Sequence, residues 1–234
     1  MQIVPPNTKI DFLGKRKIAF GLSIIMVVAT LFLLVTRGLN FGIDFTGGIL
    51  IEAEFTQAPN LTKMREELKT TGIGDISLQT FGKPTNIMIR IGQDASEQSA
   101  RNKIVEMVKN KIAESFGSEI EYRRVDYVGP KVGRELIQGG IIALLLSFAS
   151  IMLYIWFRFE WQYSVGGIVA LMHDAWITVG FFSLTQIDFD LSSIAAILTV
   201  IGYSINDSVV VYDRIRENFR KYKRMPVVEL LNLL

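Results

Sequence analysis

Asp207 is the residue that most clearly indicates chemistry in this chain. It follows Asn206 inside IAAILTVIGYSINDSVVVYDRIR, residues 194–216, a largely apolar stretch that ends in basic residues. A carboxylate inside a membrane span costs several kcal/mol unless it is paired, hydrated or protonated, so it rarely occurs there without a function. The sequence therefore predicts an ion or proton site at Asp207 and Asn206.

A second polar pair, His173 and Asp174, falls in the middle of the apolar stretch 164–185. Histidine titrates near neutrality and a neighbouring carboxylate tunes it, so the pair could relay protons. Asp174 also shares a helix face with Gly166 and Ala170, and small residues of this kind let membrane helices approach closely. The pair could therefore equally form a hydrogen bond between packed helices, and the sequence leaves both interpretations open.

Arg214 lies two helical turns beyond Asp207, on the same stripe as Tyr203 and Val210. The separation along the helix axis is about 10 Å, which is too far for a direct ion pair with Asp207. Because Arg214 stands among the basic residues that end the apolar stretch, we expect it to anchor the helix at the membrane boundary.

Four apolar stretches are long enough to be the membrane spans that hold these residues. They cover 18–35, 136–157, 164–185 and 191–212, and each approaches the roughly 20 residues that a membrane-spanning helix requires. The basic residues before the first stretch would also fit a cleaved signal peptide. That stretch is long, however, and no small-residue cleavage site closes it, so a spanning helix is favoured.

The composition fits a chain divided between membrane and water. Of its 234 residues, 50% are hydrophobic and 21% are charged, which is too apolar for an ordinary soluble domain and too charged for a chain buried entirely in lipid. The net charge of +2 argues against nucleic acid as a partner, and the absence of cysteine excludes disulfides and cysteine-ligated metals. The lipid bilayer is the partner that composition predicts.

Lysine and arginine residues flank the first and last spans. The flanking positions are Lys9, Lys15, Arg16, Lys17, Arg214, Arg216, Arg220, Lys221, Lys223 and Arg224. By the positive-inside rule, the N-terminal residues 1–17 and the basic segment 213–234 should both be cytoplasmic. Four spans return the chain to its starting side, so the number of spans agrees with the positive-inside rule. Segment 38–134 should then lie outside the cytoplasm.

Segment 38–134 alternates between the periodicities of strands and helices. The stretches expected to be strands are 49–55, 76–78, 87–91 and 119–127. Helical spacing at 61–68 and 104–112 predicts two amphipathic helices, and FGKPTN predicts a hairpin turn at Gly82 and Pro84. The resulting order, β-α-β-β-α-β, is that of a ferredoxin-like α+β domain.

The function of this domain is less constrained by its residues. It contains no recognisable metal cluster, nucleophile triad or phosphate-binding loop, so we interpret it as a lever that contacts another protein. The alternative is a spacer that merely folds, because a fold alone does not define a function.

Four motifs run through the chain in order. They are FGIDFTGG at 41–48, VDYVGPKVG at 125–133, ALMHD at 170–174 and VIGYSINDSVVVYDRIREN at 200–218. Together they closely resemble the SecF subunits of the SecD/SecF family of bacterial protein-export proteins, a branch of the resistance-nodulation-division superfamily. By this resemblance, Asp207 and Asn206 match the ion-translocation site of the family, and His173 and Asp174 match a further family pattern whose role is less settled.

The resemblance implies a multi-pass subunit of the bacterial inner membrane, with a cytoplasmic N-terminus and a periplasmic domain. With SecD as its partner, such a subunit uses the proton gradient, or sodium in some relatives, to help draw unfolded secretory polypeptides through the SecYEG channel. It is not an enzyme and needs no cofactor or metal. The family is expected to have six spans, whereas this sequence has four, so ion coupling should not be complete within these residues.

Two other functions stay open as alternatives. An intramembrane enzyme could use Asp174 and Asp207 as an acid pair, but shared-proton carboxylates must lie within a few ångströms of each other. Asp174 is expected at mid-span and Asp207 nearer the cytoplasm, about 9 Å away in depth. The second alternative is an ion-coupled small-molecule exporter of the same superfamily. Such pumps usually carry two large external domains in one long chain, whereas this sequence has one.

Overall fold

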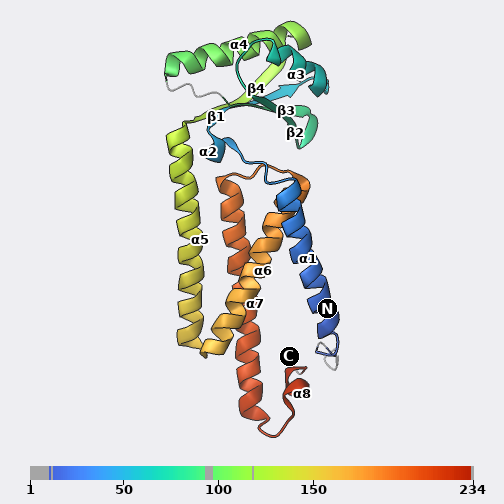
Figure 1. The fold of residues 1–234 in the computed structure, drawn as a ribbon, viewed down its shortest axis with the longest axis vertical. Helices are drawn as coiled ribbons and strands as arrows, with labels where there is room; N and C mark the ends of the chain where they lie inside the picture. Colours follow the sequence, from blue (N-terminus) through green and yellow to red (C-terminus); the bar gives the residue numbers. More distant parts are fainter. Residues whose placement is uncertain (1–10, 12, 93–96, 118, 233–234) are drawn as a thin grey trace. The chain divides into compact units, whose positions relative to one another are not determined.

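The computed structural model describes residue 11 and residues 13–92, 97–117 and 119–232. Lys9 and the other N-terminal residues assigned to the cytoplasm before position 11 lie outside the described residues. The chain divides into a helical unit, Met1–Asn40 with Ile142–Leu234, and a second unit, Phe41–Ile141, which we name the external unit after its predicted location. Figure 1 shows the elements of both units.

Among the described residues, four helices are long and apolar enough to cross a membrane, in agreement with the four spans expected from the sequence. They are α1 (Arg16–Thr36), α5 (Pro130–Arg158), α6 (Trp161–Thr185) and α7 (Leu191–Lys221). α5 begins six residues before the predicted span and α7 ends nine residues after it. A helix satisfies its own backbone hydrogen bonds, so it can continue into water beyond the apolar run from which a span is predicted.

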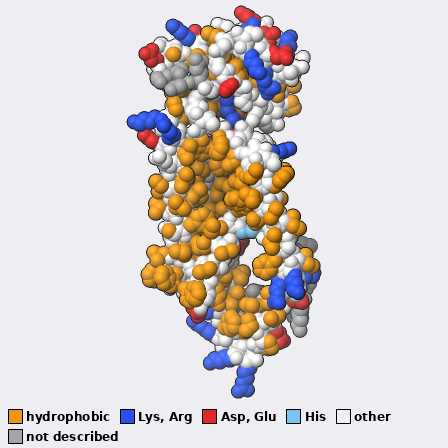
Figure 2. Space-filling view, in the orientation of Figure 1, with side chains coloured by type: hydrophobic (Ala, Val, Ile, Leu, Met, Phe, Trp, Pro, Cys, Tyr) orange, Lys and Arg blue, Asp and Glu red, His pale blue; other side chains and the backbone are white. Residues whose placement is uncertain are grey.

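Contacts in the helical unit centre on α6, which packs against both α1 and α7. Leu171 of α6 is buried against Ile197 and Ile201 of α7, and three side chains of α5 pack against this cluster, Leu144, Phe148 and Ile151. Many other large apolar side chains of the unit are exposed, and Figure 2 shows apolar side chains over much of the face in view. An apolar surface of this extent is typical of a protein surrounded by lipid.

The external unit is a small antiparallel sheet domain with two main helices. Its main elements are β1 (Gly48–Phe55), α3 (Leu61–Lys69), β2 (Ile76–Phe81), β3 (Lys83–Ile91), α4 (Gln98–Phe116) and β4 (Ile120–Val128). The strands lie in the order β2-β3-β1-β4, with antiparallel neighbours throughout. A short helix, α2 (Ile43–Thr46), precedes β1.

One face of this sheet forms the core of the external unit. Alternate residues of β1, among them Ile49 and Ile51, turn the same way and are almost fully buried. They pack against Met64 of α3 and Val108 of α4, so both helices cover the same face of the sheet. This arrangement agrees with the periodicities of the sequence.

Two glycines set the ends of strands in the external unit. Gly82 has a φ of 66°, in the left-handed region, and joins β2 to β3. Pro84, predicted as a second turn residue, lies inside β3 instead because the turn is tighter than expected. At the start of β1, Gly48 has a φ of 114°, and a side chain there would overlap the carbonyl oxygen of Ile91.

Candidate ion-translocation site

The centre of the site is a hydrogen bond between two predicted spans. Ser204 of α7 donates its hydroxyl hydrogen to Oδ2 of Asp174 on α6, over 2.5 Å. The carboxylate group is only partly buried, with 35% of its side chain exposed. Because hydrogen bonds to a carboxylate are stronger than those between neutral groups, this contact fixes α6 and α7 against each other at one level.

His173 extends the site to a third helix. Its Nδ1 lies 3.3 Å from Oδ1 of Asp174, and its Nε2 lies 2.6 Å from the hydroxyl oxygen of Ser23 on α1. With the ring proton on Nδ1, histidine donates to Asp174 and accepts from Ser23. The four residues form a continuous polar chain, Ser23–His173–Asp174–Ser204, across α1, α6 and α7.

Asp207 lies one helical turn after Ser204 and is exposed, as is Asn206. Within the described part of the chain, no hydrogen bond or ion pair involves either of these two side chains. The neighbouring Tyr203 and Val210 are also exposed, at 73% and 62%. Asp207 is therefore a carboxylate on an open face of α7, next to the polar chain but not part of it.

The depth of Asp174 differs from the expectation. Its bond to Ser204 sets it only three residues from Asp207, about 4.5 Å of helical rise, rather than about 9 Å. The expected value assumed that the centres of the two predicted spans lie at the same depth. The bond between Asp174 and Ser204 instead indicates that α6 and α7 are shifted relative to each other along their axes. The carboxylates of Asp174 and Asp207 are nonetheless not hydrogen-bonded to each other, since Asp174 bonds to Ser204 and His173.

Arg214 pairs with Glu217 on its own helix, at 2.7 Å, and not with Asp207. Around it, charged and aromatic side chains of three helices meet. Arg158 at the end of α5 lies 3.5 Å from Asp213 of α7, and the rings of Tyr163 and Tyr212 contact each other at a tilted angle, with centroids 5.0 Å apart. Aromatic and basic side chains gather in this way at membrane–water interfaces. Arg214 as a boundary anchor stays a prediction.

The sequence predicts the ionisable residues of this candidate site but does not single out Ser23 and Ser204, which the structure places in contact with His173 and Asp174. Serine is common in membrane helices, where its hydroxyl can bond to its own backbone, so no spacing rule singles out these two. Among the residues that the structure describes, no three His, Asp or Glu side chains are grouped so that they could hold a metal ion.

The fold and the site define a multi-span membrane protein with an α+β domain between its first two spans. Two family models match the chain: "Protein export membrane protein SecD/SecF, C-terminal" over residues 108–233 and "SecD/SecF GG Motif" over residues 32–59. This chain belongs to the SecD/SecF family. The second match includes Gly47 and Gly48, at the entrance to β1.

Curated relatives and solved structures agree with this assignment. The protein translocase subunits SecF of Rickettsia bellii and Rickettsia prowazekii are each 46% identical over 233 residues, which cover this whole chain and 76% and 74% of those proteins. The crystal structure of SecDF from Thermus thermophilus, described as a translocon-associated membrane protein, is 28% identical with a TM-score of 0.87. A crystal structure of SecDF in a super-membrane-facing form is also 28% identical, with a TM-score of 0.63.

The matched lengths differ between these relatives. This chain spans about three quarters of the SecF subunits but only 31% of the SecDF chain, although SecDF covers 100% of this chain. The family and the relatives give the protein a transport role in the membrane.

Proposed function

We propose that this chain is the SecF-type subunit of a Sec accessory complex that uses an ion gradient to promote protein export. In this proposal the partner is SecD, the channel is SecYEG and the substrate is an unfolded secretory polypeptide. The proton is the expected coupling ion, and sodium is the alternative. The family membership, together with SecF relatives at 46% identity, supports a role in protein translocation.

The proposed orientation follows the basic flanks of the helical unit. The N-terminus and the segment after α7 are cytoplasmic, and the external unit is periplasmic in the inner membrane. The order of its elements and the strand order β2-β3-β1-β4 favour a ferredoxin-like assignment. Since ion uptake is assigned to the helical unit, the external unit would serve as the lever that contacts the exported chain.

The observation that carries the proposal is the open, unpaired carboxylate of Asp207 in the described structure. A carboxylate that faces lipid is costly, so this face of α7 needs water, a proton or a polar partner. The spans of SecD are the proposed cover. Asp207 would take up and release the ion, while the polar chain from Ser23 to Ser204 holds α1, α6 and α7 together beside it.

The available energy is sufficient for such a step. One elementary charge that crosses 100 mV yields about 2.3 kcal/mol. That is enough to bias an equilibrium between two arrangements of α7, although complete switching takes about 5.5 kcal/mol. Repeated uptake and release at Asp207 would therefore drive a population shift rather than a single forced movement.

The test is Asp207→Asn in the full-length protein, reconstituted with SecD and the channel in proteoliposomes. The expected result is loss of the gradient-dependent part of export, with assembly and thermal unfolding unchanged, because asparagine keeps the shape but cannot exchange a proton. Asp213→Asn is the matched control on the same helix, since Asp213 pairs with Arg158 at the boundary. Full gradient dependence in the Asp207 variant would refute the proposal.

A small-molecule exporter of the same superfamily is the second candidate. It would predict gradient-driven efflux of a small substrate by the same proteoliposomes, without a secretory polypeptide. The SecF relatives favour protein export over this alternative.

A further inference from the structure

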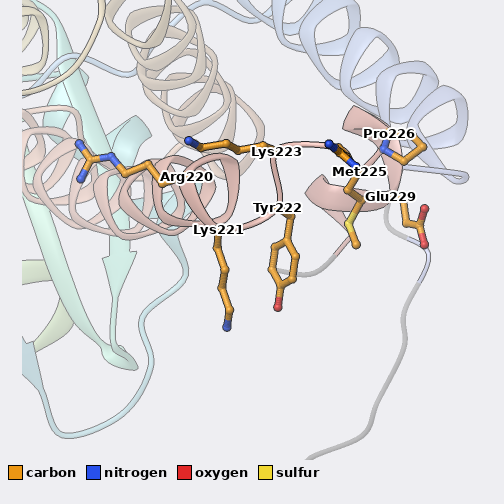
Figure 3. Close-up of a pocket in the computed structure, with 8 residues that line it drawn as sticks. Arg220, Lys221, Tyr222, Lys223, Met225, Pro226 and Glu229 are labelled. Carbon is orange, nitrogen blue, oxygen red and sulfur yellow. The ribbon is translucent and has the colours of Figure 1, made fainter.

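A basic pocket lies where α7 ends and the chain turns into α8 (Val227–Leu231). Its volume is about 600 Å³, within the range of about 300–1,000 Å³ that is usual for small-ligand sites. The residues that line it are Arg220, Lys221, Tyr222, Lys223, Arg224, Met225, Pro226 and Glu229. Figure 3 shows Lys221, Tyr222 and Met225 extending to the same side of the turn, with Glu229 near Pro226, away from Arg220.

The charge of this pocket is almost entirely positive. Among its lining residues, all in the described part of the chain, four are basic and Glu229 is the one carboxylate. None of these four basic side chains forms an ion pair with an acidic side chain of the described residues. Arg214 and Arg216, by contrast, pair with Glu217 and Asp213 on α7. The pocket therefore presents uncompensated positive charge.

Hydrogen bonds fix α8 beside the start of α1. The side chain of Asn232, the residue after the end of α8, accepts from the backbone N–H of Leu13 at 3.1 Å and donates to Asp11 at 2.8 Å. α1 begins at Arg16, so these contacts hold α8 next to the residues that directly precede a span. Figure 1 likewise shows the chain turning back after α7 so that α8 lies near the beginning of α1.

Apolar side chains accompany the basic ones. Val227 and Val228 of α8 are 54% and 53% exposed, whereas Leu230 is buried. Exposed apolar residues next to lysine and arginine are typical of segments that lie in the membrane interface, with the apolar groups in the acyl boundary and the cations at the headgroups. Lys15, Arg16 and Lys17 are exposed at the start of α1 and add to the same basic edge.

We propose that this pocket binds the headgroup of an anionic phospholipid from the leaflet at this end of the helical unit. Arg220, Lys221, Lys223 and Arg224 would together supply the positive charge that attracts the phosphate, and Val227 and Val228 would lie against the acyl chains. Clusters of lysine and arginine beside a membrane helix attract anionic lipids in this way. The bound lipid would hold the ends of α7 and α1 at a fixed depth, independently of ion coupling at Asp207.

Lipid binding by the purified chain in a non-ionic detergent tests this proposal. Native mass spectrometry would measure the affinity for phosphatidylglycerol and for phosphatidylcholine, which differ in headgroup charge. We expect phosphatidylglycerol to bind about tenfold more tightly, and the preference to fall as salt screens the charges. Equal affinities for the two lipids in the unmodified chain would overturn the proposal.

Substitutions assign the binding to this pocket. Replacing Arg220, Lys221, Lys223 and Arg224 by glutamine should reduce the preference to less than about twofold, since the attraction is electrostatic. The matched control replaces four exposed lysines of the external unit, Lys63, Lys69, Lys83 and Lys103, and should keep the full preference. The opposite result for either variant would overturn the proposal.

Two further experiments test whether the turn is folded and whether the bound molecule is a lipid. Glu229→Gln removes the carboxylate of the pocket and should strengthen phosphatidylglycerol binding, which a merely misfolded turn would not do. Inorganic phosphate in large excess should leave the lipid bound. If phosphate displaced the lipid at equal concentration, the occupant would be a soluble phosphate compound and the lipid assignment would be wrong.

Discussion

At the scale of single residues, the hydroxyl of Ser204 is the contact that fixes the position of Asp174. Ser204→Ala removes this donor, and hydrogen bonds between membrane helices contribute about 0.5–2 kcal/mol. We expect a loss of stability in this range, measured as the free energy of unfolding in detergent. Ser208→Ala is the matched control, because within the described chain the hydroxyl of Ser208 makes no hydrogen bond. Equal losses in both variants would contradict the role of Ser204.

Polarity alone predicts part of the candidate site. Asp207, Asn206, His173 and Asp174 stand out from the sequence because polar side chains within apolar stretches are costly and few. Their partners do not stand out, since the choice of Ser23 for His173 depends on how α1 crosses α6, which no local pattern encodes. How α6 lies lengthwise against α7 is likewise not encoded locally. The expected depth difference of about 9 Å between Asp174 and Asp207 is wrong for this reason.

Asp190 caps the first turn of α7 and should make its stability depend on pH. Its side chain accepts from the backbone N–H of Ser193 at 2.9 Å and from the hydroxyl of Ser192 at 2.6 Å. Burial acts to raise the pKa of Asp190, but the hydrogen bonds from Ser192 and Ser193 together outweigh it, so the pKa lies below the usual 3.8. The ionised cap therefore contributes stability above pH 3.8 that is lost as pH falls through the lowered pKa.

Two substitutions distinguish the stability contributed by the capping side chain of Asp190 from the stability contributed by its negative charge. Asp190→Ala should cost about 0.5–2 kcal/mol near neutral pH, measured by thermal unfolding in detergent. Asp190→Asn retains a capping side chain but does not titrate, so the difference between aspartate and asparagine should shrink as the pH falls from about 6 to about 3. A difference that grows on acidification would contradict the lowered pKa.

At the scale of elements, the contact between α1 and α6 depends on the missing side chain of Gly180. A Cβ at this position would overlap Oγ1 of Thr30, which is itself only 3% exposed. Gly180→Ala should therefore push α1 away from α6 and cost about 1–3 kcal/mol, as overpacked cores do. The measurement is thermal unfolding, with cross-linking between α1 and α6 as the structural readout.

Gly202 on α7 provides the matched control for Gly180. In the described structure, a Cβ at Gly202 would have no atom within 4 Å apart from its chain neighbours and the backbone of its own helix. Gly202→Ala should thus leave the α1–α6 contact intact, and should be neutral or slightly stabilising because alanine favours the helix. Loss of the cross-link in this variant would show that the effect of Gly180→Ala is not specific to the contact with Thr30.

The existence of the main elements was easier to predict than their ends. Apolar runs indicated all four long helices, and the two periodicities indicated the strands and helices of the external unit. The ends depend on backbone hydrogen bonds that continue where the apolar pattern stops, as after Tyr212 in α7. The short helix α2 was missed because four residues are too few to show a period.

At the scale of the whole molecule, the two units have separate cores, so damage to one should not spread to the other. The core of the external unit includes Ile51, which is completely buried, whereas that of the helical unit centres on Leu171. Ile51→Ala should cost the external unit about 2–5 kcal/mol through lost burial and a cavity. Hydrogen exchange should accelerate in β1, β3 and β4 and stay unchanged in α6 and α7, because local unfolding follows cooperative units.

Val125→Ala on β4 is the control for this experiment, since Val125 is 43% exposed and should leave exchange in the sheet nearly unchanged. If Ile51→Ala instead accelerated exchange in α6 and α7 to the same degree, the two units would unfold as one. A lever needs a rigid body that moves without unfolding the helices that drive it. If hydrogen exchange in the two units is independent, the result would agree with the proposed roles. In that proposal ions bind in the helical unit and the external unit contacts the exported chain.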